Sequence, residues 1–157
     1  MKIKGINDYD IVNYKKPSLF VAFPYCTFKC EKECGMQVCQ NSALATASCI
    51  DVEYEDILSR YDNSPLTHAL VFGGLEPFDS YKDLVGLIKA VRGHTDDDIV
   101  IYTGYNAKEI VDLVEPLTEY PNIIIKYGRF IPDDIAHFDD VLGVELASHN
   151  QYAKRIS

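Results

Sequence analysis

The sequence is poor in basic residues and histidine, and it has no tryptophan. Of its 157 residues, 15 are Lys or Arg and 24 are Asp or Glu, which gives a formal net charge of −9. This charge has the wrong sign for a protein that binds by neutralising phosphates, so we expect no nucleic-acid partner. His68, His94 and His137 are far apart and form no His-x-x-x-His or His-Glu pair, which argues against a catalytic zinc ion or a histidine base.

Long apolar runs are also absent. The longest ones, such as Ser18–Phe23, are far shorter than the roughly 20 residues that cross a bilayer. Residues 1–5 (Met-Lys-Ile-Lys-Gly) do not resemble the start of a signal peptide with an apolar core. We therefore expect a cytoplasmic protein with no membrane partner.

The chain does contain the residues that a globular domain needs. Hydrophobic residues make up 47% of it and aromatic residues 11%, which is enough to build a buried core and argues against disorder. No internal repeat, low-complexity tract or Pro/Gly/Ser-rich linker divides the sequence. We predict a single domain that spans residues 1–157.

The cysteines are the unusual feature of the composition. Cys26, Cys30, Cys34 and Cys39 lie close together, and Cys49 follows ten residues later. In a reducing cytoplasm such a cluster indicates metal binding or catalysis rather than a disulfide framework. Four thiolates suit a structural zinc ion, although the C-x2-C pairs typical of zinc sites are missing. Three thiolates suit a four-iron cluster and leave one iron open to a further ligand.

Apolar runs and amphipathic segments alternate along the chain. The predicted buried strands are 18–23, 68–72, 98–102 and 122–126, and the predicted helices are 51–61, 80–92 and 106–117. Asp51 is the expected N-cap of the first helix, and Asn106 with Glu109 makes a capping-box pattern at the start of the last one. This alternation predicts an α/β fold with a mainly parallel sheet and right-handed crossovers.

Parallel strands end at one edge of their sheet, and the loops after them bind ligands there. In this sequence the loops after the first three strands span residues 24–41, 73–79 and 103–106. The cysteines, the Gly-Gly-Leu-Glu-Pro turn and the Tyr-Thr-Gly-Tyr segment fall in or beside these loops. We expect them to converge on one rim.

Several motifs occur in the order in which one known family carries them. They are Asp10-Ile-Val-Asn13, Cys26-Thr-Phe-Lys-Cys30, Cys39-Gln-Asn41, Gly73-Gly-Leu-Glu-Pro77, Ile101-Tyr-Thr-Gly-Tyr105, Tyr127-Gly-Arg-Phe130 and Ser148-His-Asn-Gln151. With them the chain resembles the radical S-adenosylmethionine enzymes that activate anaerobic ribonucleoside-triphosphate reductase. The resemblance extends over nearly the whole chain. It implies an incomplete β/α barrel of the radical S-adenosylmethionine type.

The resemblance also implies that three cysteines hold a [4Fe-4S] cluster. The family's usual spacing is C-x3-C-x2-C, whereas this chain has C-x3-C-x8-C, with six additional residues before the last cysteine. We expect Cys26, Cys30 and Cys39 to be the ligands, because Gln40-Asn41 follows Cys39 as in the family. Cys34, inside the insertion, is the alternative third ligand.

A second implied cofactor is S-adenosylmethionine, chelated by the open iron. Gly73 and Gly74 would let the backbone approach its amino group, and Glu76 would offer an acceptor nearby. Taken alone, this turn is better explained as a tight link between a strand and a helix. The other residues implied in cofactor binding are Asn41, Tyr102 and Thr103 (the last two, with Tyr105, beside the adenosine) and Lys126, facing the methionine carboxylate. We expect no catalytic residue other than the ligands of the cluster.

The implied function is an oxidoreductase that cleaves S-adenosylmethionine reductively. It would generate a glycyl radical on the large subunit of anaerobic ribonucleoside-triphosphate reductase and take electrons from a flavodoxin- or ferredoxin-type donor. The alternatives are activation of another glycyl-radical enzyme, radical chemistry on a small molecule, or a zinc or iron–sulfur binding module without enzymatic activity.

Overall fold

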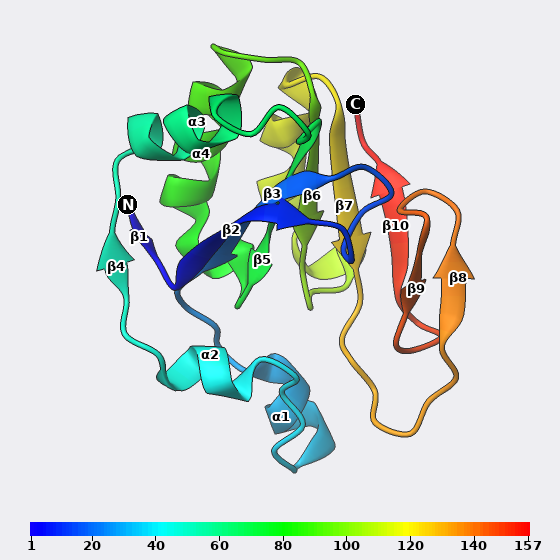
Figure 1. The fold of residues 1–157 in the computed structure, drawn as a ribbon. Helices are drawn as coiled ribbons and strands as arrows, with labels where there is room; N and C mark the ends of the chain where they lie inside the picture. Colours follow the sequence, from blue (N-terminus) through cyan, green and yellow to red (C-terminus); the bar gives the residue numbers. More distant parts are fainter.

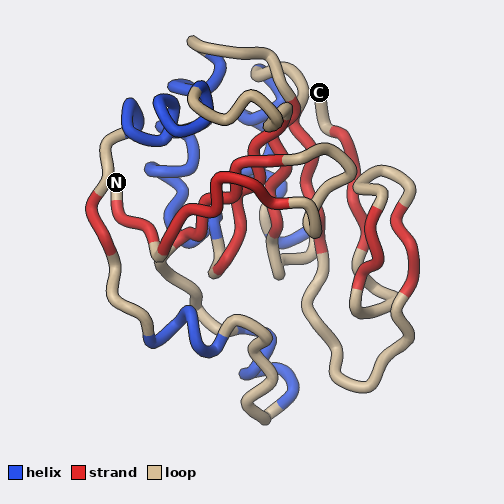
Figure 2. The backbone as a smooth tube through the Cα atoms, viewed as in Figure 1, coloured by secondary structure: helices blue, strands red, loops and turns tan.

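The computed structural model describes residues 1–157 and has a mixed α/β fold. Helices α3 (Tyr54–Asp62) and α4 (Tyr81–Arg92) lie along one side of a twisted sheet (Figure 1). Helices α1 (Lys29–Cys34) and α2 (Ser42–Thr46) lie apart from them, beyond one end of the strands. Figure 2 shows that loops join this outlying part to the rest of the chain on either side.

The central sheet has six strands in the order β10-β7-β6-β5-β3-β2. Its inner strands run parallel to one another and are β3 (Ser18–Phe23), β5 (Ala69–Gly74), β6 (Asp98–Tyr102) and β7 (Ile123–Tyr127). The four strands predicted from apolar runs are therefore present, with ends within two residues of the predicted ones. Their carboxyl ends all lie at one edge of the sheet.

Both faces of these strands are buried, by different partners. Leu70 and Phe72 of β5 belong to the larger apolar core, together with Leu84 and Ile88 of α4. Val71, between them in sequence, belongs to a second core on the opposite face, because successive side chains of a strand point to opposite sides. The second core is closed by Tyr14, Leu142 and Leu146, which come from loops and a short strand rather than from helices. The helices thus cover one face only.

The edge strands were not predicted. β2 (Gly5–Asp10) pairs antiparallel with β3, and β10 (Tyr152–Arg155) pairs antiparallel with β7. Two further pairs lie outside the main sheet, namely β1 (Lys2–Ile3) with β4 (Ile50–Asp51) and β8 (His137–Asp139) with β9 (Val144–Leu146). The main sheet is open, and its classification as an incomplete barrel stays a prediction.

The first predicted helix begins later than expected. Asp51 is not its N-cap, because this residue lies in β4 and pairs with Lys2 at 3.1 Å. Helix α3 instead begins at Tyr54 with a capping box, in which Glu53 and Asp56 each accept from the other's backbone N–H. The position of the cap was therefore wrong by two residues.

The segment predicted as a helix over residues 106–117 is broken. Its capping box is present, since Asn106 and Glu109 each accept from the other's backbone N–H. After the cap, the chain forms a 3-10 turn, η2 (Ala107–Glu109), one turn of helix, α5 (Val111–Val114), and a second 3-10 segment, η3 (Glu115–Glu119). Pro116 has no N–H to donate to a carbonyl of the preceding turn, so the hydrogen-bond pattern of a regular α-helix does not continue through it.

The cysteine segment is held against the body at few points. Neither α1 nor α2 has a buried residue. The Lys4 ammonium donates to the carbonyl oxygen of Ala45 at 3.2 Å, and the Asn41 side chain donates to Gly74 O at 2.6 Å.

None of the helices combines the length and the apolar composition that crossing a bilayer requires.

Candidate functional site

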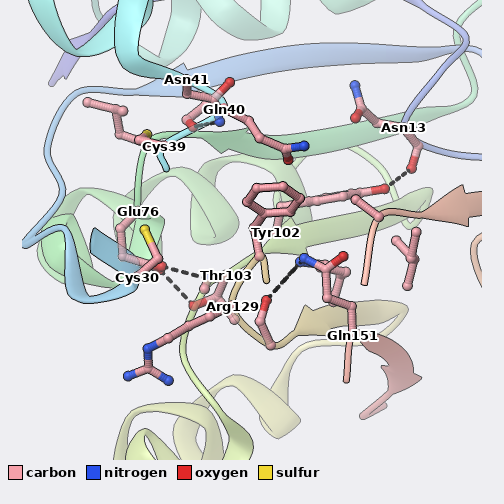
Figure 3. A pocket seen from close by; sticks show the side chains of 18 of the residues that line it. Asn13, Cys30, Cys39, Gln40, Asn41, Glu76, Tyr102, Thr103, Arg129 and Gln151 are labelled. Atoms are coloured by element: carbon pink, nitrogen blue, oxygen red, sulfur yellow. Dashed lines mark hydrogen bonds between the residues drawn. The ribbon is translucent and has the colours of Figure 1, made fainter. Parts of the chain in front are cut away.

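The carboxyl ends of the parallel strands surround a cavity of about 420 Å³. The cysteine segment, the turn after β5, the loops after β6 and β7 and the segment around β9 all contribute to its lining. Figure 3 shows Cys30 and Cys39 on one side of the cavity and Asn13 and Gln151 on the other. The predicted convergence of the loops on one rim is present in the structure.

Three of the clustered cysteines face this cavity. Cys26, Cys30 and Cys39 line it, whereas Cys34, the last residue of α1, does not. All five cysteines, including Cys49, are free thiols of intermediate exposure. The structure thus separates Cys34 from the other three.

The cavity thiols are partly withdrawn from solvent. Burial raises the pKa of Cys26 to about 11, although the N–H of Phe28 lies 3.2 Å from its Sγ atom. Burial also raises the pKa of Cys30, and Cys39 is close enough to add to this effect. Each thiolate therefore needs a positive partner such as a metal ion.

The turn after β5 requires glycine at one of its two positions. Gly74 has φ +82°, and a Cβ atom there would lie 2.8 Å from Ala22 Cα. Its carbonyl oxygen accepts the hydrogen bond from Asn41, and both residues line the cavity. Gly73 does not line the cavity, and a Cβ there would meet the Phe20 ring at 3.2 Å. Gly74 therefore provides the close backbone approach, and it also connects the turn to the cysteine segment.

Glu76 is buried beside the cavity and its carboxylate is occupied by protein donors. Oε1 accepts from Phe78 N at 3.1 Å and from the Thr103 hydroxyl at 2.8 Å, and Oε2 accepts from Gly104 N at 2.9 Å. Burial raises the pKa of Glu76 to about 7 despite these bonds. The residue joins the turn after β5 to the loop after β6. Its predicted role as acceptor for an amino group stays a prediction.

Tyr102 and Lys126 occupy neighbouring strand ends and line the cavity together. The Tyr102 hydroxyl donates to Asn13 O at 2.6 Å, which leaves the ring along the wall. The Lys126 ammonium lies 5.9 Å from the centre of that ring and donates to Gly128 O at 3.0 Å. Burial lowers the pKa of Lys126 to about 8. A buried cation in the cavity wall suits an anionic ligand group.

Other sequence-predicted residues are divided between the cavity and its surroundings. Gln151 lines the cavity and donates to Gly128 O at 3.3 Å. Tyr105 is not part of its lining but borders a small adjoining cavity of about 40 Å³. His149 is exposed and pairs with Asp134 at 2.5 Å. The expectation that Tyr105 borders the same space as Tyr102 is therefore not met in the larger cavity.

Two parts of the wall were not predicted from the sequence. Phe20 lines the cavity, and its neighbours Leu19 and Val21 point into the larger core on the other face. The alternation of side chains along a strand was a usable signal for this position. Residues 144–147 also line the cavity, but β9 has only three residues and is too short to give a recognisable pattern.

A model of known protein families, described as a 4Fe-4S single cluster domain, matches residues 16–149. The chain belongs to this family. The matched part of this 4Fe-4S single cluster domain includes all five cysteines and every strand from β3 to β9. A search of curated proteins and a search of solved structures gave no match. The chain is thus an iron–sulfur protein, as the family resemblance implied.

The residues of this 4Fe-4S single cluster domain fit the group that its family binds. Three thiols line one cavity, which is the donor set for a four-iron cluster with one open iron. As they stand, no three His, Cys, Asp or Glu side chains are gathered closely enough to enclose a metal ion. The fit therefore rests on the chemistry of the three thiols and on their exposure to the same cavity.

Proposed function

We propose that the protein is a radical S-adenosylmethionine enzyme that activates anaerobic ribonucleoside-triphosphate reductase. The observation that carries this proposal is the single cavity lined by three cysteines and by the turn and strand-end residues of the family resemblance. In the proposal Cys26, Cys30 and Cys39 hold the cluster, and Cys34 is not a ligand. This choice is supported by the position of Cys34 outside the cavity lining.

The cavity offers complementary partners for each part of S-adenosylmethionine. A cluster held by Cys26, Cys30 and Cys39 would supply, once reduced, the one electron needed to cleave a sulfonium–carbon bond of S-adenosylmethionine, giving methionine and a 5′-deoxyadenosyl radical. The buried ammonium of Lys126 provides a positive charge for the methionine carboxylate. Gly74 allows close backbone approach, and the Tyr102 ring gives an apolar surface for adenosine. Glu76 and Thr103 hold the two loops between which the ligand would lie.

The proposed substrate is a protein, namely the large subunit of the reductase, with a flavodoxin- or ferredoxin-type electron donor. The cavity lies at the carboxyl end of an open sheet, where strand ends, the cysteine segment, the loops after the strands and β9 line it. An accessible cavity of this kind suits a loop inserted from a partner protein.

Anaerobic reconstitution of the protein and two cysteine variants tests the proposal. The wild type should be brown, bind about four irons and release 5′-deoxyadenosine when reduced with S-adenosylmethionine. Cys39→Ala should lose both properties, whereas the matched variant Cys34→Ala should keep them. The reverse result would make Cys34 the ligand, and a colourless protein with one zinc ion would overturn the cluster chemistry.

The partner is tested separately by electron paramagnetic resonance. Reduced protein mixed with S-adenosylmethionine and the candidate reductase should produce a glycyl-radical doublet. A doublet with a different glycyl-radical enzyme but none with the reductase would redirect the partner assignment. Formation of 5′-deoxyadenosine with a small molecule alone would argue for a small-molecule substrate.

A further inference from the structure

An ion-pair network links the loops after β6 and β7 to the helix that carries two of the cysteines. Arg129, which is only 5% exposed, donates through both terminal nitrogens to Glu109 at 2.7 Å each. The hydrogen bonds to Arg129 are the main reason that the pKa of Glu109 is lowered to about 2. This bidentate pair is the anchored half of the network.

The other half comes from α1. The Lys29 ammonium lies 3.3 Å from Glu109 Oε1 and 4.4 Å from the centre of the Tyr105 ring. Arg129 Nε lies 3.1 Å from a carboxylate oxygen of Glu33, which belongs to the insertion before Cys39. Residues near both ends of the six-residue helix thus contact the same ion pair, in which Arg129 is buried and Glu109 is not.

Helix α1 has little else to order it. Six residues are far below the roughly 12–15 at which isolated helices become even marginally stable in water. None of its residues is buried, and its N-cap residue, Phe28, makes no capping hydrogen bond through its side chain. The helix therefore depends on contacts with the body, and the ion pairs to Glu109 and Arg129 supply them.

We propose that Arg129 and Glu109 are positioning residues that hold α1 in place before the cluster binds. They would fix Cys30, which lies in α1, relative to Cys26 and Cys39. The inference rests on the cluster-binding part of the proposed function and not on its substrate or partner. Glu33, in the lengthened segment between Cys30 and Cys39, contributes to the same network through its ion pair with Arg129.

The network also places charges beside the proposed ligands. Lys29 and Arg129 border the small cavity together with Cys26 and Cys30. Two cations and two carboxylates nearly cancel, so removal of one member leaves a net charge near the cluster. A positive charge stabilises the reduced, more negative cluster, and a negative charge destabilises it.

Hydrogen exchange of the cluster-free protein tests the positioning role directly. In Arg129→Gln, amides of residues 28–34 should exchange about tenfold faster or more, and in Glu33→Gln, which changes a largely exposed side chain, they should exchange about two- to fivefold faster. Arg60→Gln is the matched control, because Arg60 lies on α3 and the change breaks its exposed ion pair with Asp8 of β2. Equal exchange of residues 28–34 in all variants, or no protection of them in the wild type, would overturn the proposal.

The reduction potential of the reconstituted cluster distinguishes an electrostatic effect of Arg129 and Glu109 from a purely steric effect of changing these side chains. Arg129→Gln should shift the potential to more negative values and Glu109→Gln to more positive values, while Arg129→Lys should restore most of the wild-type value. Shifts of the same sign in both glutamine variants would overturn the electrostatic part. A wild type that binds no iron refutes the proposed function, but the exchange result still decides whether the network orders α1.

Discussion

Replacement of Gly74 by alanine should destabilise the fold through backbone strain and a steric clash. The residue ends β5 with φ +82°, a conformation that costs a residue with a Cβ atom roughly 1–2 kcal/mol. The new Cβ would also lie 2.8 Å from Ala22 Cα and 2.9 Å from Ala22 Cβ, both in the neighbouring strand β3. Overpacking of this kind costs about 1–3 kcal/mol. We expect a total loss of about 2–5 kcal/mol.

Urea unfolding of the cluster-free protein, followed by circular dichroism, measures this loss as a lower midpoint at unchanged slope. Gly5→Ala is the matched control, because Gly5 also lies in a strand of the sheet but a Cβ there meets nothing within 4 Å. That control should be neutral or stabilised by about 0.4–1 kcal/mol, through the lower entropy of the unfolded chain. If Gly74→Ala unfolds within about 0.5 kcal/mol of the wild type, the steric reasoning is refuted.

Three further predictions concern buried polar groups and the cysteine segment. Because burial raises the pKa of Glu76 from 4.5 to about 7, the folded protein holds a proton that the unfolded chain has lost between these values, so the free energy of unfolding should fall by about 3 kcal/mol as pH rises through this window. Urea titrations at several pH values should show that decline in the wild type relative to Glu76→Gln; parallel curves would contradict it. Asp98 is buried and hydrogen-bonded to Tyr14, Lys16 and Arg155, so Asp98→Asn should lower the free energy of unfolding by about 1.5–3 kcal/mol. The same urea titration at neutral pH measures this loss, and an unchanged midpoint would refute the role of these bonds. Because Asn41 is exposed, Asn41→Ala should keep the free energy of unfolding within about 0.5 kcal/mol of the wild type. It should nevertheless speed hydrogen exchange of the amides in residues 39–46. Unchanged exchange there would show that the bond from Asn41 to Gly74 O does not hold the segment.

The inner sheet was predictable because its strands are buried on both faces. Such strands appear as short continuous apolar runs, and residues 69–72, 99–101 and 123–125 are all buried. Their parallel pairing then fixes where the loops meet, so the cavity rim followed from the order of motifs. The edge strand β10 has no such run, because three of its four residues are exposed. Its pairing with β7 depends on a fold that is already formed.

Local interactions were predictable only where they involve neighbouring residues. Asn106 and Glu109 lie three residues apart, and their capping box was recognised from this spacing. Asp51 also resembles a cap, but its backbone is engaged by β1, a partner about 50 residues away in sequence. Tertiary pairing therefore overrode a plausible local signal at this position.

Glu109 shows how one carboxylate serves both kinds of interaction. Its capping of Asn106 is local, whereas its pairing with Arg129 depends on the register that places Tyr102 of β6 beside Lys126 of β7. From these strand ends the two loops carry Glu109 and Arg129 to the same point on the rim. The capping box holds the Glu109 side chain in the direction from which Arg129 donates to it. The lengthened segment between Cys30 and Cys39 can then be ordered by adding one carboxylate, Glu33, to a pair that the sheet has already brought together.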